Sequence, residues 1–186
     1  AERGVLTSLN SDNADLARRL NLEAAKTIRY GGLGRQQALD MVTVNPARQL
    51  GVDGRVGSIA AGKDADLVLW SGDPLSVYTV ADLTFVDGRL RFSREADQAH
   101  RATVVGARAR LVAEVGGKAA PASAPTTAAA QANPPAPAEH YRYDPAAPAG
   151  AVAITGATGH TRAGPASPAG VVVFAGGRIT AVGGPD

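Results

Sequence analysis

One stretch of this chain cannot contribute to a packed core, and it therefore decides how the rest can be divided. Residues 116–150 contain seven of the twelve prolines, among many alanines and almost no large apolar side chains. Such a segment buries too little surface to offset the entropy lost on ordering, and its prolines favour extended, semi-rigid conformations. We predict a linker here, with a larger folded part before it and a shorter one after it.

Composition limits the classes of partner. With 186 residues, 45% of them hydrophobic, the chain can form one ordinary core or pieces of two. The net charge is +2 and the basic residues are scattered, which predicts neither a nucleic acid nor a membrane surface as partner. No apolar run approaches the ~18 residues of a membrane span. The lack of cysteine excludes disulfides and thiolate metal sites, and it is compatible with the bacterial cytoplasm or the periplasm.

The first 52 residues have the pattern of the end of an α/β unit. A short apolar run at residues 4–9 predicts a strand, and apolar residues at helical spacing predict helices over residues 13–30 and 35–44. Asn45 and Pro46 are typical of a cap and a first-turn proline, which predicts a short third helix. The other strands of such a unit are absent, so we expect the chain to be part of a longer protein.

Asp12 lies in Ser11-Asp12-Asn13, where the predicted strand turns into the first helix. It is the only plausible catalytic carboxylate of the chain. An Asp at such a junction is more often a helix N-cap, which accepts hydrogen bonds from free N–H groups of the first turn. Both interpretations stay open at this point.

The periodicity becomes strand-like after residue 52. We predict strands at residues 55–59 and 65–70 around a turn at residues 61–64, and Leu67–Trp70 is apolar at every position, as in a strand buried on both faces. Asp87-Gly88 between two apolar runs predicts a β-hairpin. Ser93 can cap a helix that runs towards residue 115 with a thin apolar stripe. After the linker, we predict strands at residues 152–155, 171–174 and 178–182.

Six ordered motifs resemble the C-terminal part of the amidohydrolase superfamily, and its imidazolonepropionase-like and Xaa-Pro-dipeptidase-like branch is most similar. They are SDN at residues 11–13, RRLNLEAAK at 18–26, TVNPARQLG at 43–51, GSIAAGKDADLVLW at 57–70, SGDPL at 71–75 and VDGRL at 86–90. Ala61 stands where the family often has proline, which affects only the stiffness of the turn. Residues 153–183 resemble the N-terminal start of the same superfamily. The order suggests two tandem units joined by the linker.

The resemblance implies a fold and four regions. We expect an α/β fragment with the last strand and helices of a (β/α)8 barrel, together with a small composite β-sandwich built from both ends of a unit. Residues 1–52 would be the end of the barrel, 53–115 sandwich strands and a trailing helix, 116–150 the Ala/Pro-rich linker, and 151–186 the first strands of a second unit. The strands of the second unit would then complete the sandwich of the first.

The resemblance also implies a role for Asp12. This residue matches the aspartate after the eighth barrel strand, which binds a divalent metal, commonly zinc, and takes a proton from the attacking water. The metal in turn lowers the pKa of that water and polarises the scissile carbonyl. The implied function is hydrolysis of C–N bonds in small-molecule amides, cyclic amides or peptides, and a homo-oligomer is a further implied partner.

The remaining ligands of the family's metal site have no match in this chain. They are an H-x-H pair, a Lys or Glu and two further histidines, whereas His100, His140 and His160 all have the surroundings of surface histidines and Lys63 lies in a predicted turn. Because a catalytic zinc needs about three protein ligands, we expect this polypeptide alone to be inactive. The alternative is a structural or interaction module with an amidohydrolase-like sandwich, in which Asp12 only caps a helix.

Overall fold

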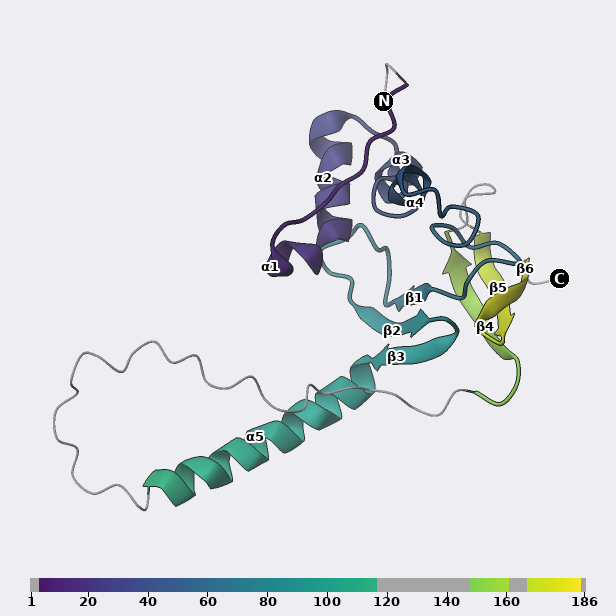
Figure 1. Cartoon of the computed structure of the whole chain (residues 1–186). Coiled ribbons are helices and arrows are strands. Elements are labelled where there is room, and N and C mark those ends of the chain that lie inside the picture. The colour runs from purple at the N-terminus through teal and green to yellow at the C-terminus, as the bar shows by residue number, and fades with distance from the viewer. Residues whose placement is uncertain (1–3, 117–147, 161–166, 185–186) are drawn as a thin grey trace.

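The computed structural model describes residues 4–116, 148–160 and 167–184. Four short helices come first, a three-stranded sheet and a long helix follow, and a second three-stranded sheet ends the chain (Figure 1). The helices are α1 (Ala14–Ala17), α2 (Leu20–Gly31), α3 (Arg35–Asp40), α4 (Val44–Gln49) and α5 (Arg94–Gly116). The strands are β1 (Leu67–Trp70), β2 (Ala81–Val86), β3 (Arg89–Ser93), β4 (Val152–Gly159), β5 (Ser167–Ala175) and β6 (Arg178–Gly183).

The helix expected over residues 13–30 is two helices, α1 and α2. Arg19 leaves the helical region, with φ −126° and ψ 18°, and its carbonyl then accepts from Leu22 and Glu23 as α2 begins. No residue of α1 is buried, so its own cap and turn hold it, whereas Ala24 of α2 is fully buried with Ala38 of α3. Packing therefore stabilises α2 but not α1.

The first sheet has the order β1-β2-β3 and is antiparallel throughout. It confirms the predicted hairpin: Asp87 and Gly88 both have positive φ, at 50° and 68°, as the turn between two tightly paired strands requires. The expectation that residues 67–70 are buried on both faces is wrong at Val68, which is 44% exposed while Leu67 is 6% exposed. Strand β1 has one neighbour in its sheet, β2, and covers the core with one face only.

Residues 55–59 form turns and not the expected strand. Lys63 lies against this loop, and its ammonium group donates to the carbonyl of Asp53 at 2.5 Å and to the hydroxyl of Ser58 at 2.7 Å. Gly57 has φ +85° and packs so tightly against α4 that an added Cβ would stand 2.8 Å from the Cβ of Ala47. The loop is thus folded by its own turns and by contact with the helices, which leaves no edge for strand pairing.

The second sheet has the order β4-β5-β6 and confirms the strands expected after the linker. It contacts the first part of the chain through backbone hydrogen bonds: Gly62 N–H donates to Ile179, Ile179 N–H to Lys63 and Ala65 N–H to Gly177, each at 2.8 Å. The two sheets share one hydrophobic cluster, in which the rings of Phe85 and Phe174 meet edge to face at 5.3 Å. Strands that precede and strands that follow the predicted linker therefore contribute to one core.

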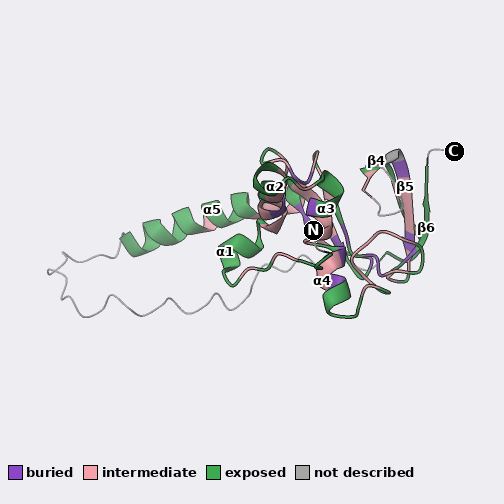
Figure 2. Cartoon of the chain, turned by 90° about the horizontal axis from the view of Figure 1, so that it is seen from above, coloured by how far each residue is buried: buried purple, intermediate pink, exposed green. Residues whose placement is uncertain are grey.

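Helix α5 projects away from both sheets, and almost all of its length is exposed (Figure 2). Its start agrees with the predicted cap, since the hydroxyl of Ser93 accepts from the N–H of Ala96 at 3.4 Å. The apolar stripe has no partner within the described residues, and Val105, Leu111 and Val115 are 68%, 60% and 70% exposed. None of the described helices combines the length and hydrophobicity needed to cross a membrane.

Most of the predicted linker lies outside the described residues, as does His140.

Candidate functional site

The segment that carries Asp12 is extended but is not a strand, contrary to the expectation for residues 4–9. A strand requires a neighbour for its hydrogen bonds, and no other strand of the described chain lies beside this segment. Side chains of helix α4 instead provide hydrogen-bond donors for this segment. The side-chain amide of Asn45 donates to the carbonyl of Thr7 at 2.8 Å, and that of Gln49 donates to the carbonyl of Leu6 at 3.0 Å.

The turn at residues 11–13 is held by the two residues that flank Asp12. The hydroxyl of Ser11 donates to the carbonyl of Asn13 at 2.6 Å and accepts from its N–H at 3.1 Å. The side-chain oxygen of Asn13 accepts from the N–H groups of Asp15 at 2.7 Å and Leu16 at 3.4 Å. Asn13 is therefore the N-cap of α1, with φ −123° and ψ 131°.

Asp12 itself is exposed, and its carboxylate makes no hydrogen bond or ion pair with the residues that the structure describes. The alternative in which Asp12 caps the helix is wrong, because Asn13 fills that position. A carboxylate at the tip of a rigid turn, with both oxygens open, can take a ligand or a proton from water. Nothing else in the local structure uses it.

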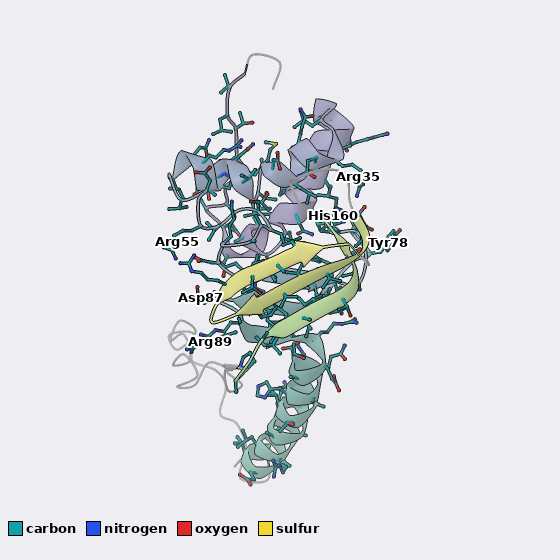
Figure 3. The ribbon with its side chains drawn as sticks, turned by 90° about the vertical axis from the view of Figure 1, so that its right-hand side faces the viewer. Arg35, Arg55, Tyr78, Asp87, Arg89 and His160 are labelled. Atoms are coloured by element: carbon teal, nitrogen blue, oxygen red, sulfur yellow. The ribbon has the colours of Figure 1, made fainter. Side chains whose placement is uncertain are left out.

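The described residues do not form a metal site by themselves. No group of three or more His, Cys, Asp or Glu side chains within them could hold a metal ion. Lys63 is committed to the loop at residues 53–58, as expected for a turn residue. His160 directly follows β4 and lies near the ion pair of Arg35 and Asp73 (Figure 3). A lone Asp12 does not fit a catalytic metal, which needs about three protein ligands.

Two cavities lie in the described part of the chain, and Asp12 lines neither. One, of about 600 Å³, lies where the turn of the β2–β3 hairpin meets that of the β5–β6 hairpin, and Arg55, Asp87 and Arg89 lie along this side (Figure 3). Asp64 is buried there, accepts a hydrogen bond from Arg55 at 2.7 Å and forms an ion pair with Arg178 at 3.1 Å. The hydrogen bond with Asp64 raises the pKa of Arg55. The other, of about 540 Å³, lies between the start of α2 and the first sheet. Neither cavity is next to the candidate carboxylate.

Asn45 and Gln49 are functional candidates that the sequence analysis missed. We expected Asn45 to be a helix cap. Thr43 occupies that position, and Asn45 lies inside α4. The available signal was the spacing of two side-chain amides four residues apart, which places them on one face of a helix. What those amides bind depends on a segment about 40 residues earlier, so the sequence alone does not predict the contact.

The chain is similar in sequence to known proteins. The amidohydrolase family matches residues 1–94. The chain is 42% identical to the amidohydrolase tasK of Hapsidospora irregularis over 92 residues, which are 49% of this chain and 9% of that protein. It is 43% identical to the imidazolonepropionase of Shewanella frigidimarina over 53 residues, 28% of this chain and 12% of that enzyme.

Among solved structures, an amidohydrolase from Thermotoga maritima MSB8 matches with a TM-score of 0.48 and 40% identity, over 50% of this chain and 24% of that one. The chain spans only about a tenth of the length of the curated relatives that it matches, at 9% and 12%. The family match covers residues 1–94 of 186, which include the Asp12 turn, all four short helices and the first sheet. The chain belongs to the amidohydrolase family.

Proposed function

We propose that residues 1–115 are the C-terminal part of a metal-dependent hydrolase unit that cleaves C–N bonds, with Asp12 as its general base and one of its metal ligands. One observation carries the proposal: Ser11 and Asn13 hold the turn and cap α1, while the carboxylate between them stays exposed and without a described partner. A residue needed only for local structure would form hydrogen bonds within the turn, as Ser11 and Asn13 do.

The chemistry that this chain contributes is that of one carboxylate. Asp12 can accept a proton from a water molecule that attacks a carbonyl carbon. A divalent metal such as zinc needs about three protein ligands, so its site would require residues beyond those described. We therefore expect the isolated chain to have no turnover.

The substrate class is a small-molecule amide, cyclic amide or peptide. The chain is 43% identical to an imidazolonepropionase over 53 residues, and this similarity supports the substrate class, although those residues are 12% of that enzyme. Family membership alone supports hydrolysis in general.

The proposal includes a second unit. Residues 151–186 would be the first strands of another amidohydrolase-like unit, and they would complete a composite sandwich with residues 53–93. The hydrogen bonds between residues 62–65 and β6, together with the contact of Phe85 with Phe174, support this arrangement.

The test is Asp12→Asn in the intact protein that contains this segment. We expect kcat for hydrolysis of a panel of cyclic amides and dipeptides to fall by about 10²–10⁴-fold, because the side chain keeps its shape but loses its basicity. Asp15→Asn is the matched control, because Asp15 is also an exposed carboxylate, three residues further on in the first turn of α1. Thermal unfolding of both variants should match the unmodified protein to within a few degrees.

If Asp12→Asn retains full activity, the catalytic role of Asp12 is wrong. If the intact protein hydrolyses none of the panel with or without added zinc, the chain is better described as a structural module.

A further inference from the structure

We propose that Asn45 and Gln49 are positioning residues for Asp12: their side-chain amides fix the segment from which the Asp12 turn projects. The inference rests on the proposed function only for its effect on catalysis. Its structural half concerns the order of residues 6–13 and can be tested separately.

The two amides are matched to the segment. Asn45 and Gln49 are four residues apart on α4, so their side chains lie on one face, one turn apart. Their carbonyl partners are those of Thr7 and Leu6, which are consecutive, at 2.8 and 3.0 Å. Because the two carbonyls belong to adjacent residues and both accept from α4, the bonds hold this part of the segment at two neighbouring points.

The orientation of the Gln49 amide is also determined. The hydroxyl of Ser8 donates to the side-chain oxygen of Gln49 at 2.5 Å, so the NH₂ group of the same amide is left for the carbonyl of Leu6. Gln49 thus contacts the segment at two residues on either side of Thr7. A flipped amide would lose both bonds at once.

Together the contacts leave little freedom between α4 and the turn. The N–H of Leu9 donates to the carbonyl of Met41 at 3.0 Å, so each of residues 6 to 9 is bonded to the segment from residue 41 to 49. The bonds between Ser11 and Asn13 begin two residues later. The position of Asp12 is therefore linked to α4 through a short, hydrogen-bonded path.

This arrangement predicts a specific kinetic effect. A general base must stand within hydrogen-bond reach of the proton that it removes, and a displacement of about 1 Å can cost about 10²-fold in rate. Loss of the amide donors would misplace Asp12 without removing any group that touches the substrate. We expect kcat to fall by about 10²-fold with KM nearly unchanged.

The variants are Asn45→Asp and Gln49→Glu, which keep size and shape but replace a donor by an acceptor that faces a carbonyl. The matched control is Asn21→Asp, because the side chain of Asn21 also donates to a distant carbonyl, that of Pro74 at 2.6 Å, and has no contact with the Asp12 segment. Two readouts are needed: hydrogen exchange of the amides of residues 6–13 in this chain, and kcat and KM in the intact protein.

We expect faster exchange of the Leu9 N–H, which donates to the carbonyl of Met41, in Asn45→Asp and Gln49→Glu but not in Asn21→Asp. We also expect Asn45→Asp to add no further loss of kcat when combined with Asp12→Asn, because both changes act through one group. Unchanged exchange in both variants overturns the proposal, as does a loss of kcat that multiplies with that of Asp12→Asn. If exchange rises while the unmodified intact protein has no hydrolase activity, the structural half stands and the proposed function fails.

Discussion

The contact between Phe85 and Phe174 gives a direct test of whether the two sheets form one core. Phe85 lies in β2 and Phe174 in β5, 89 positions later, and their rings are 5.3 Å apart at 65°. They are 8% and 1% exposed. We propose to change each to leucine, singly and together, because leucine keeps the site apolar and removes the edge-to-face geometry.

The expected magnitudes follow from the packing. Each single change should lower the free energy of unfolding by about 0.5–3 kcal/mol, as for other core substitutions. An aromatic pair of this geometry contributes about 0.5–1.5 kcal/mol beyond its buried area, so the double variant should lose less than the sum of the singles by about that amount. In urea, a change of about 1 kcal/mol shifts the midpoint by roughly 0.3–1 M.

The chain has a convenient probe for this experiment. Its single tryptophan, Trp70, lies in β1, so its fluorescence follows the first sheet while Phe174 lies in the second. Phe174→Leu should therefore lower the urea midpoint seen by Trp70. Tyr78→Leu, at a side chain that is 93% exposed, should not. A Trp70 midpoint that does not respond to Phe174→Leu, with strictly additive singles, would refute a shared core.

Two further predictions concern the loop and an ion pair. Gly57→Ala should destabilise the chain by about 1–3 kcal/mol, because φ is +85° and the new Cβ would stand 3.0 Å from the Cα of Val44. Gly54→Ala, with open space around it, is the control, and equal thermal midpoints for the two would contradict this reasoning. Burial raises the pKa of Asp73, but hydrogen bonds from Arg35 and from the N–H of Leu75 outweigh it, so its pKa is lowered below 3.8. A lowered pKa means that Asp73 stabilises the fold above its unfolded-state pKa and loses this contribution as the pH falls through its folded-state value. Asp73→Asn should flatten the acid limb of stability below about pH 4, measured by urea midpoints across pH, and an unchanged acid limb would count against the ion pair.

The sequence predicted the elements whose signals are local. The Asp87-Gly88 hairpin, the helix that begins after Ser93 and the strands around Gly176-Gly177 all formed as expected, because turn chemistry, caps and periodicity act within a few residues. The failures have a tertiary cause. We expected residues 55–59 to form a strand, but contact with α4 and the side chain of Lys63 hold them as turns. Residues 4–9 have a strand's composition but no strand beside them.

The candidate site divides in the same way. Asp12 was identified from its place between an apolar run and a helix, and from the motifs that resemble the amidohydrolase superfamily. The sequence did not predict that Asp12 leaves the cap position to its neighbour, because adjacent Asp and Asn residues are equally good helix caps. The backbone angles and hydrogen bonds of the structure assign the cap to Asn13. The amides of Asn45 and Gln49 were likewise visible only as polar residues on a short helix.

The sequence by itself determined the family and the elements whose signals are local, and it identified Asp12, the proposed general base, between an apolar run and a helix. These depend on residue type and on spacing along a few turns or strands. The tertiary structure alone decided which side chains hold the Asp12 segment, and that Phe85 and Phe174 share a core. Those contacts join residues 38 to 89 positions apart, and a side chain's partner at that distance is set by how the elements pack and not by its neighbours in the chain.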